Sequence, residues 1–259
     1  MLQKPSRDPN FLFFTSINDN DKNGFMTTIH ELDRTKGLDL ILHTPGGDAA
    51  ATESLVYYLR QMFEDIRTII PQLAMSAGTM IAMSCRTIVM GKQSSLGPID
   101  PQIMGIPAHA AIKEFEEAFI EIKKDPTQIP IWQARVARFP IAFIKECRQA
   151  IDWSDEIVKD WLITGMFKDL TPEEAEEKVD KILEEFGDHS LTKSHSRHIS
   201  ALKGKETGLK IEMLEDDQKL QEAVLSLHHS VMLTLTATPA IKIIENHKGK
   251  AFIQTLPPI

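Results

Sequence analysis

The segment 38–43 constrains the fold of this chain most. Its sequence, LDLILH, is a nearly continuous apolar run that stops at TPGGD (44–48). An apolar run without alternation is typical of a strand that is covered on both faces, and a proline followed by two glycines is a strong turn signal. Strands of this kind occur mainly in parallel sheets with helices on either side, so the sequence predicts an α/β fold.

The sequence after this turn alternates between helical and strand patterns. We expect a strand over 66–75, a short apolar helix over 77–84, a strand over 86–92 and, before them, a helix whose apolar face includes Leu55, Val56, Leu59, Met62 and Phe63. A strand–helix–strand–helix–strand order of this kind indicates parallel βαβ units that are joined by right-handed crossovers.

The remainder of the chain is predicted to be mostly helical. We expect a strand over 11–14 and a helix over 25–34, then helices over 108–124, 140–166, 171–187 and 216–232. Thr171 and Glu174 form a capping box, which is a clear helix start. We expect one domain over 1–259, with a mainly βαβ core in 1–107, a helical part in 108–190, and a closing segment, helix and tail in 191–259.

Composition disfavours several classes of protein. The net charge is −8 and no basic cluster stands out, which argues against a nucleic-acid partner. No stretch reaches the roughly 18 apolar residues that cross a bilayer, and the first residues lack the apolar run of a signal peptide, so we expect a cytoplasmic protein without a membrane span. Cys85 and Cys147 lie far apart, which disfavours a disulfide framework or a zinc site. We expect no metal and no cofactor.

Two motifs place chemically useful groups at strand ends. Gly46 and Gly47 follow the strand 38–43 directly, where glycines let the backbone turn sharply and bring its amides close to a ligand. Ser76 lies at the junction between a strand and a helix. A serine there is exposed at the carboxyl edge of the sheet and at a helix N-terminus, which favours developing negative charge.

Each motif has a plain structural explanation when it is taken alone. Turns with two glycines are common, and a serine at a helix start is usually an N-cap. Together the two motifs indicate a shared site, because both loops leave adjacent parallel strands at the same end of the sheet. The amides of Gly47 and Ala77 are then expected to converge beside the Ser76 hydroxyl. An oxyanion hole next to a nucleophile is the minimum equipment for acyl transfer.

Three segments resemble the Clp-fold serine proteases, in particular the serine dehydrogenase proteinase family, relatives of the Clp protease subunit and of signal peptide peptidase A. They are LDLILHTPGGDAAATESLVYYLRQ, IIPQLAMSAGTMIAMS and IVMGKQSSLGPIDPQ, with a weaker match at ISALKGKETGLKIEML. The resemblance implies a Clp/crotonase-like fold and a serine endopeptidase with Ser76 as nucleophile and with Gly47 and Ala77 as oxyanion hole. It also implies peptide or unfolded-protein substrates and a homo-oligomer, a trimer or hexamer.

The general base departs from the best-known pattern of that family. Clp protease subunits use a histidine and an aspartate, but this chain has no histidine at the place where theirs falls relative to SSLGPIDPQ (94–102), and no aspartate in SHSRHIS (194–200). Signal peptide peptidase A uses a lysine on a helix beyond this segment, and Lys113 holds a comparable place. A lysine base needs a pKa lowered by about 3 units through burial. The alternative for Lys113 is a surface ion pair with Glu117 at i+4.

Other side chains compete for the role of base. His109 lies one helical turn before Lys113, and a histidine needs little tuning to act near neutral pH. Lys92 and Asp100 flank the SSLGPID turn, although Asp100 has a simpler explanation as a turn residue before a proline. His43 is expected at most to brace the glycine turn. A cluster of His195, Arg197 and His198 is assigned no role, because such clusters are usually polar loops.

A second function class stays open at this point. Crotonase relatives use the same pair of amides on acyl-CoA thioesters without a serine nucleophile, and a catalytically silent scaffold would keep the fold and the oligomer but lack a base. The sequence shows no obvious acyl-CoA signature, and Ser76 stands where the protease branch needs it.

Overall fold

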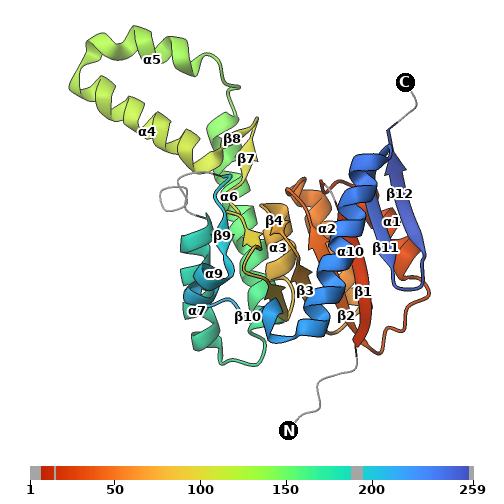
Figure 1. The fold of residues 1–259 in the computed structure, drawn as a ribbon. Coiled ribbons are helices and arrows are strands. Elements are labelled where there is room, and N and C mark those ends of the chain that lie inside the picture. Colours follow the sequence, from red (N-terminus) through yellow and green to blue (C-terminus); the bar gives the residue numbers. More distant parts are fainter. Residues whose placement is uncertain (1–6, 15, 188–194, 257–259) are drawn as a thin grey trace.

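The molecule is built around a twisted seven-stranded sheet, which is described here from a computed structural model of residues 7–14, 16–187 and 195–256. Its strand order is β10-β5-β3-β2-β1-β11-β12 (Figure 1). The strands from β10 to β1 run parallel, and β11 and β12 form an antiparallel hairpin at one edge. The strands span Arg7–Phe14 (β1), Gly37–His43 (β2), Ile66–Ile70 (β3), Thr87–Met90 (β5), Ile211–Met213 (β10), Ala240–Asn246 (β11) and Ala251–Thr255 (β12).

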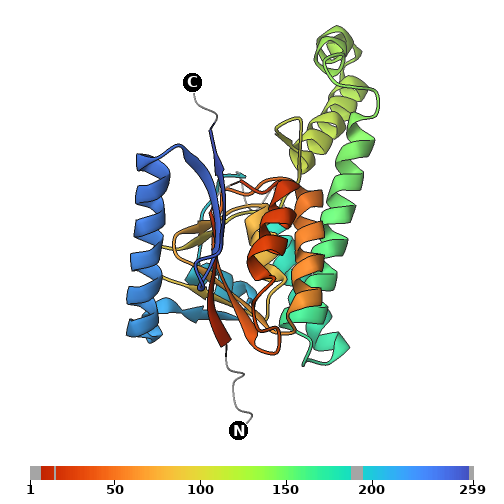
Figure 2. The same cartoon turned by 90° about the vertical axis from the view of Figure 1, so that its right-hand side faces the viewer.

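Helices cover both faces of this sheet (Figure 2). One face packs against α10 (Gln218–Ala237), and the other against α1 (Asn20–Ile29), α2 (Ala49–Met62), α3 (Ala77–Met83) and α6 (Phe143–Trp161). The strands supply the two cores alternately. In β2, Leu40 and Leu42 join the core under α1 and α2, whereas Ile41 joins the core under α10. This alternation follows from the two-residue period of a strand, and it explains why the segment reads as a continuous apolar run.

A second, three-stranded sheet lies at the carboxyl end of the parallel strands. It consists of β4 (Leu73–Ala74), β6 (Ser95–Leu96) and β9 (Ile199–Ser200), in the order β4-β6-β9. β4 pairs with β6 in parallel, and β6 pairs with β9 in antiparallel register, with Leu96 opposite Ile199. Each strand has only two residues, but their pairing holds together three loops that are far apart in the sequence.

A helical arm projects from the body of the molecule (Figures 1 and 2). It begins with the short hairpin of β7 (Gln102–Ile103) and β8 (Ile106–Pro107) and continues through α4 (Ala108–Lys124), η1 (Pro126–Gln128) and α5 (Ile129–Val136). The chain then returns along α6, ends that helix in a π-helical turn (Leu162–Met166), and forms α7 (Pro172–Gly187), α9 (Ala201–Thr207) and η3 (Leu214–Asp216).

The α/β fold class and most element positions are confirmed. α4 spans the predicted residues, and the capping box at the start of α7 is present, because the Thr171 amide donates to Glu174 and the Glu174 amide donates to the Thr171 hydroxyl. None of the helices within the described ranges is long and apolar enough to cross a membrane.

Several boundaries were predicted wrongly. The segment 66–75 holds two strands, β3 and β4, because Pro71 lacks the N–H that a continuous ladder needs. The first helix begins at Asn20 instead of residue 25 and ends at Ile29, and α5 was not predicted. The tail after α10 forms β11 and β12, where β11 supplies buried residues such as Ile243 and Ile244 to the two cores.

Candidate active site

Ser76 occupies a strained turn between β4 and α3. Its backbone has φ 50° and ψ −117°, and its side chain is half-buried. Positive φ is uncommon for a residue with a side chain, and such strain persists where the surrounding structure enforces it, often at active sites. The conformation presents the serine at the start of α3, where it borders an open cavity.

The glycine turn after β2 is packed tightly against a neighbouring loop. The amide of Ile17 donates to the Gly46 carbonyl at 2.8 Å, and the amide of Asp48 donates to the Ile17 carbonyl at 3.0 Å. A Cβ atom on Gly47 would overlap the backbone of Ile17, and one on Gly46 would lie 2.9 Å from the Ser76 Cβ. Both positions therefore require glycine, because Gly47 lies too close to Ile17, and Gly46 too close to Ser76, for a side chain to fit.

Gly47 and Ala77 line the same cavity as Ser76. In the glycine turn, the Gly46 amide donates to the Thr44 hydroxyl and the Asp48 amide donates to the Ile17 carbonyl. The Gly47 amide takes part in neither of these hydrogen bonds. Ala77 is the first residue of α3, and the first amides of a helix have no acceptor within it. Gly47, Ser76 and Ala77 therefore lie around one cavity, with the Ala77 amide at the start of a helix.

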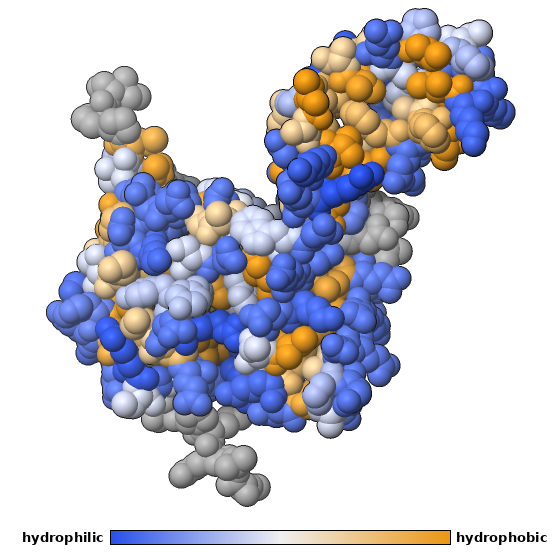
Figure 3. Space-filling view, turned by 180° about the vertical axis from the view of Figure 1, so that it is seen from behind, coloured by the Kyte–Doolittle hydropathy of each residue, from blue (hydrophilic) through white to orange (hydrophobic). Residues whose placement is uncertain are grey.

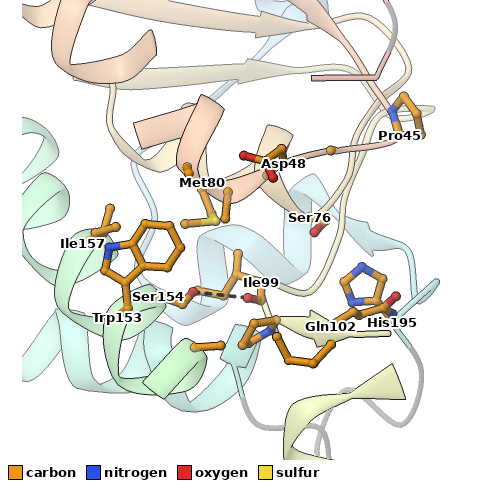
Figure 4. Close-up of a pocket in the computed structure, with 17 residues that line it drawn as sticks. Pro45, Asp48, Ser76, Met80, Ile99, Gln102, Trp153, Ser154, Ile157 and His195 are labelled. Carbon is orange, nitrogen blue, oxygen red and sulfur yellow. Dashed lines mark hydrogen bonds between the residues drawn. The ribbon is translucent and has the colours of Figure 1, made fainter. Parts of the chain in front are cut away.

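A histidine of a histidine–carboxylate pair lines the same cavity as the serine. His195 Nδ1 is 2.8 Å from Asp100 Oδ1, and Asp100 is completely buried. A carboxylate at Nδ1 favours the tautomer that carries a proton there, which leaves Nε2 free to accept one. His195 and Ser76 line one cavity and lie close together in the close-up (Figure 4). The sequence alone assigns His195 no role, and it allows Asp100 near the site but explains it more simply as a turn residue.

The three-stranded sheet explains how these distant residues meet. Ser76 follows β4 by two residues, and Asp100 follows β6 by four. His195 precedes β9 by four residues, so continuing the antiparallel β6–β9 register places it opposite Asp100. No local sequence pattern gives this pairing, because it depends on contacts between two-residue strands.

The cavity beside Ser76 has a volume of about 440 Å³ and an apolar far end. Met80 from α3, Ile99 from the loop after β6, and Trp153 and Ile157 from α6 line that end (Figure 4). Of the described residues that line the cavity, only Asp48 and His195 carry ionisable side chains. Asp48 is held in place as the N-cap of α2, since its Oδ1 accepts the Ala51 amide at 2.7 Å.

The two base candidates from the sequence lie elsewhere. Lys113 is exposed on α4, and neither Lys113 nor His109 lines the cavity. Lys92 donates its backbone amide to Glu215, away from the cavity lining. Over the described ranges, no group of three histidine, cysteine, aspartate or glutamate side chains is arranged to hold a metal ion.

His43 lies at the end of β2, just before the glycine turn, and contacts α10. His228 Nε2 is 3.2 Å from His43 Nδ1. Burial, and next the proximity of His228, lower the pKa of His43 to about 4. The pKa of His228 is also lowered, by burial and then by His229. Both rings are therefore neutral at physiological pH.

Comparisons with known proteins identify the family of the chain. The model of the ClpP-like SDH-type serine proteinases matches residues 9–249. Uncharacterized protein MJ0137 of Methanocaldococcus jannaschii is 29% identical over 199 residues, which are 77% of this chain and 61% of that protein. Uncharacterized protein MJ1495 of the same organism is 41% identical over 78 residues, which are 30% of this chain and 27% of that protein. The chain thus spans less than two thirds of the length of either relative.

A solved structure of a mutant of the 1510-N membrane-bound stomatin-specific protease is also similar. It is 19% identical, the match covers 81% of this chain and 80% of that chain, and the TM-score is 0.47. The family match carries the assignment, because it extends over nearly the whole chain. The chain belongs to the ClpP-like SDH-type serine proteinases and has the ClpP-like fold of that family.

Proposed function

We propose that this protein is a serine endopeptidase that uses Ser76 as nucleophile, His195 as general base and Asp100 to orient the histidine. The amides of Gly47 and Ala77 form the oxyanion hole. The observation that carries the proposal is the 2.8 Å contact between the buried Asp100 and His195, which lines the same cavity as Ser76. Lys113, which lies outside that cavity lining, is replaced as base by a residue that borders it.

The reaction follows from the roles of these groups. The Ser76 Oγ attacks the carbonyl carbon of the scissile bond while His195 Nε2 takes the hydroxyl proton. The negative charge that develops on the carbonyl oxygen is stabilised by the two amides, and a donor of this type contributes about 10²–10³ in rate. His195 then gives its proton to the leaving amine. Water, activated by the same histidine, releases the acyl group and restores Ser76.

A labelling experiment tests these roles. A fluorophosphonate probe should modify Ser76 in the wild-type protein, and peptide mapping should locate the adduct there. Labelling should disappear in Ser76→Ala and slow strongly in His195→Gln. The variant Lys113→Met separates the two candidate bases, because it should react like the wild type if His195 is the base. Normal labelling of His195→Gln together with loss in Lys113→Met would refute the proposed base.

The lining of the cavity supports a preference for a large apolar residue before the cleaved bond. An apolar side chain that enters between Met80 and Trp153 removes its surface from water, which contributes roughly 1.5–3 kcal/mol when burial is complete. A charged side chain there would lose its hydration without an ion-pair partner at the apolar end. Cleavage sites in a mixed peptide library should therefore follow leucine, methionine or phenylalanine. Cleavage mainly after lysine, arginine or glutamate would contradict this preference.

We also propose that the protein forms a homo-oligomer through the α4–α5 arm. Large apolar side chains are exposed along it, among them Phe119 (70%), Ile120 (63%) and Ile131 (57%). The view from behind shows hydrophobic residues gathered on the arm (Figure 3). Exposed apolar patches of this kind usually mark protein–protein contact sites. The arm carries acidic residues such as Glu116 and Glu117 on α4 and the basic residues Arg135 and Arg138 around the end of α5. Because both signs are present, the arm of a second copy is complementary in charge to it.

Light scattering tests the assembly. The wild-type mass should be a multiple of 29.2 kDa at micromolar concentration. Phe119→Glu combined with Ile120→Lys should lower that mass toward one chain while the protomer keeps its circular dichroism spectrum. Leu233→Glu, an equally exposed apolar site on α10, is the matched control and should leave the mass unchanged. A wild-type mass of one chain would refute the oligomer.

A further inference from the structure

Two buried threonine hydroxyls connect the loops that carry the proposed catalytic groups. Thr44 follows β2 and Thr79 lies in α3, and both side chains are completely inaccessible to solvent. Neither borders the cavity beside Ser76, so neither is placed to touch a substrate. Their contacts are nevertheless directed at the glycine turn, the Ser76 turn and the loop that leads to Asp100.

Thr44 shapes the glycine turn from the inside. Its Oγ1 accepts the Gly46 amide at 3.1 Å and lies 3.2 Å from the Gly46 carbonyl oxygen, to which it donates. Gly46 in turn packs against Ser76, since a Cβ atom there would lie 2.9 Å from the Ser76 Cβ. The hydroxyl therefore fixes the residue that precedes Gly47, one proposed oxyanion donor, and that closely approaches the amide of Ala77, the other.

The backbone and methyl group of Thr44 reach the serine turn as well. Its amide donates to the Leu73 carbonyl at 3.0 Å, and its carbonyl accepts the Met75 amide at 2.9 Å. Its methyl group occupies the space where a side chain on Gly78 would lie. Thr44 thus contacts both sides of Ser76, from Leu73 in the strand before it to Gly78 in the helix after it.

Thr79 connects the serine turn to the loop after β6. Its Oγ1 is 2.7 Å from the Ala74 carbonyl and 2.9 Å from the Gly97 carbonyl, and it accepts the Gly97 amide at 2.9 Å. Gly97 stands three residues before Asp100. One hydroxyl therefore fixes the spacing between the chain that leads into Ser76 and the chain that leads to Asp100.

We infer that Thr44 and Thr79 are positioning residues for the proposed active site, which they serve by holding three loops in register. This inference rests on the proposed function. Hydrogen bonds between buried groups are costly to leave unmade, so each hydroxyl specifies one arrangement of its loops. Catalysis is sensitive to such arrangements, because a misplacement of about 1 Å costs about 10²-fold in rate.

Isosteric substitutions test the inference on the full chain. Thr44→Val and Thr79→Val remove the hydroxyl and keep the shape, whereas Thr44→Ser and Thr79→Ser keep the hydroxyl. Thr68→Val is the matched control, because Thr68 is equally buried in β3 but donates to Cys85 Sγ at 2.8 Å, away from the cavity. If a valine variant does not fold, the corresponding alanine variant, which also lacks the hydroxyl, is measured in its place.

The measurements are kcat and KM on a peptide that the wild type cleaves, and the melting temperature of each variant. Both valine variants should lose about 10–10²-fold in kcat, while KM stays within about two-fold of the wild-type value. The serine variants should keep most of the wild-type kcat. Thr68→Val should lose stability without a comparable loss in kcat. Retention of kcat in the valine variants, or an equal loss in Thr68→Val, would overturn the inference. Failure of Ser76 labelling in the wild type would refute the proposed function itself.

Discussion

Two regions at the carboxyl end of the sheet each hold a histidine, and their surroundings differ. On the pocket side, His195 contacts the buried carboxylate of Asp100 and borders an open cavity. On the α10 side, His43 packs against His228, and burial lowers its pKa to about 4. A carboxylate partner and an open cavity suit a histidine that exchanges protons with a substrate. Burial against another histidine suits one that stays neutral and supports the fold.

The largest expected effect is a loss of activity that occurs when His195 is substituted but not when His43 is. His195→Gln should lower kcat/KM by about 10⁴-fold or more, since loss of a catalytic histidine removes the proton acceptor for the serine. His43→Gln, at the other histidine, should cost less than about ten-fold. Comparable losses of kcat/KM in both variants would show that the different surroundings of the two histidines do not determine which one is catalytic. The measurement is steady-state hydrolysis of one peptide by both variants and the wild type.

A smaller effect is expected from the partner of His195. Asp100→Asn should lower kcat by about 10²–10⁴-fold, because an amide favours the wrong histidine tautomer. Asp169→Asn is the matched control, since Asp169 forms an exposed ion pair with Arg86 at 2.9 Å and lies outside the cavity. An Asp100→Asn variant that keeps wild-type kcat would remove the carboxylate from the proposed mechanism and leave His195 without an orienting group.

The smallest expected effect concerns stability and the α10 side. The folded-state pKa of His43 is about 4, below its ordinary value of 6.5, so the unfolded chain binds a proton first as the pH falls. The stability from neutral His43 is therefore fully present above about pH 6.5 and is lost as the pH falls toward 4. His43→Gln should reduce the drop in melting temperature between pH 7.5 and pH 5 by a few degrees. An unchanged drop would contradict the lowered pKa.

The fold could be predicted largely from the segment 38–92, because buried strands and glycine turns leave a local signature. The positions of Gly47, Ser76 and Ala77 were predicted for the same reason, since each stands where a strand ends. His195 was not found, because its contact with Asp100 crosses 95 residues and depends on the pairing of β6 with β9. Strands of two residues carry no periodicity that a sequence could reveal.

The family pattern also directed attention to the wrong residue types. A histidine was sought near SSLGPIDPQ and an aspartate in SHSRHIS, but the chain has an aspartate in the first segment and a histidine in the second. The structure brings these two side chains together with the types exchanged.

The short strand β9 has a consequence for the timing of activity. Under the proposed mechanism, a ribosome completes the serine and both oxyanion amides roughly 120 residues before it adds His195. At about 5–20 residues per second, the nascent chain spends on the order of 6–24 s with a nucleophile but without its base. Until β9 is synthesised and pairs with β6, the nascent chain therefore lacks the histidine that the proposed mechanism needs, which would protect neighbouring nascent chains from premature cleavage.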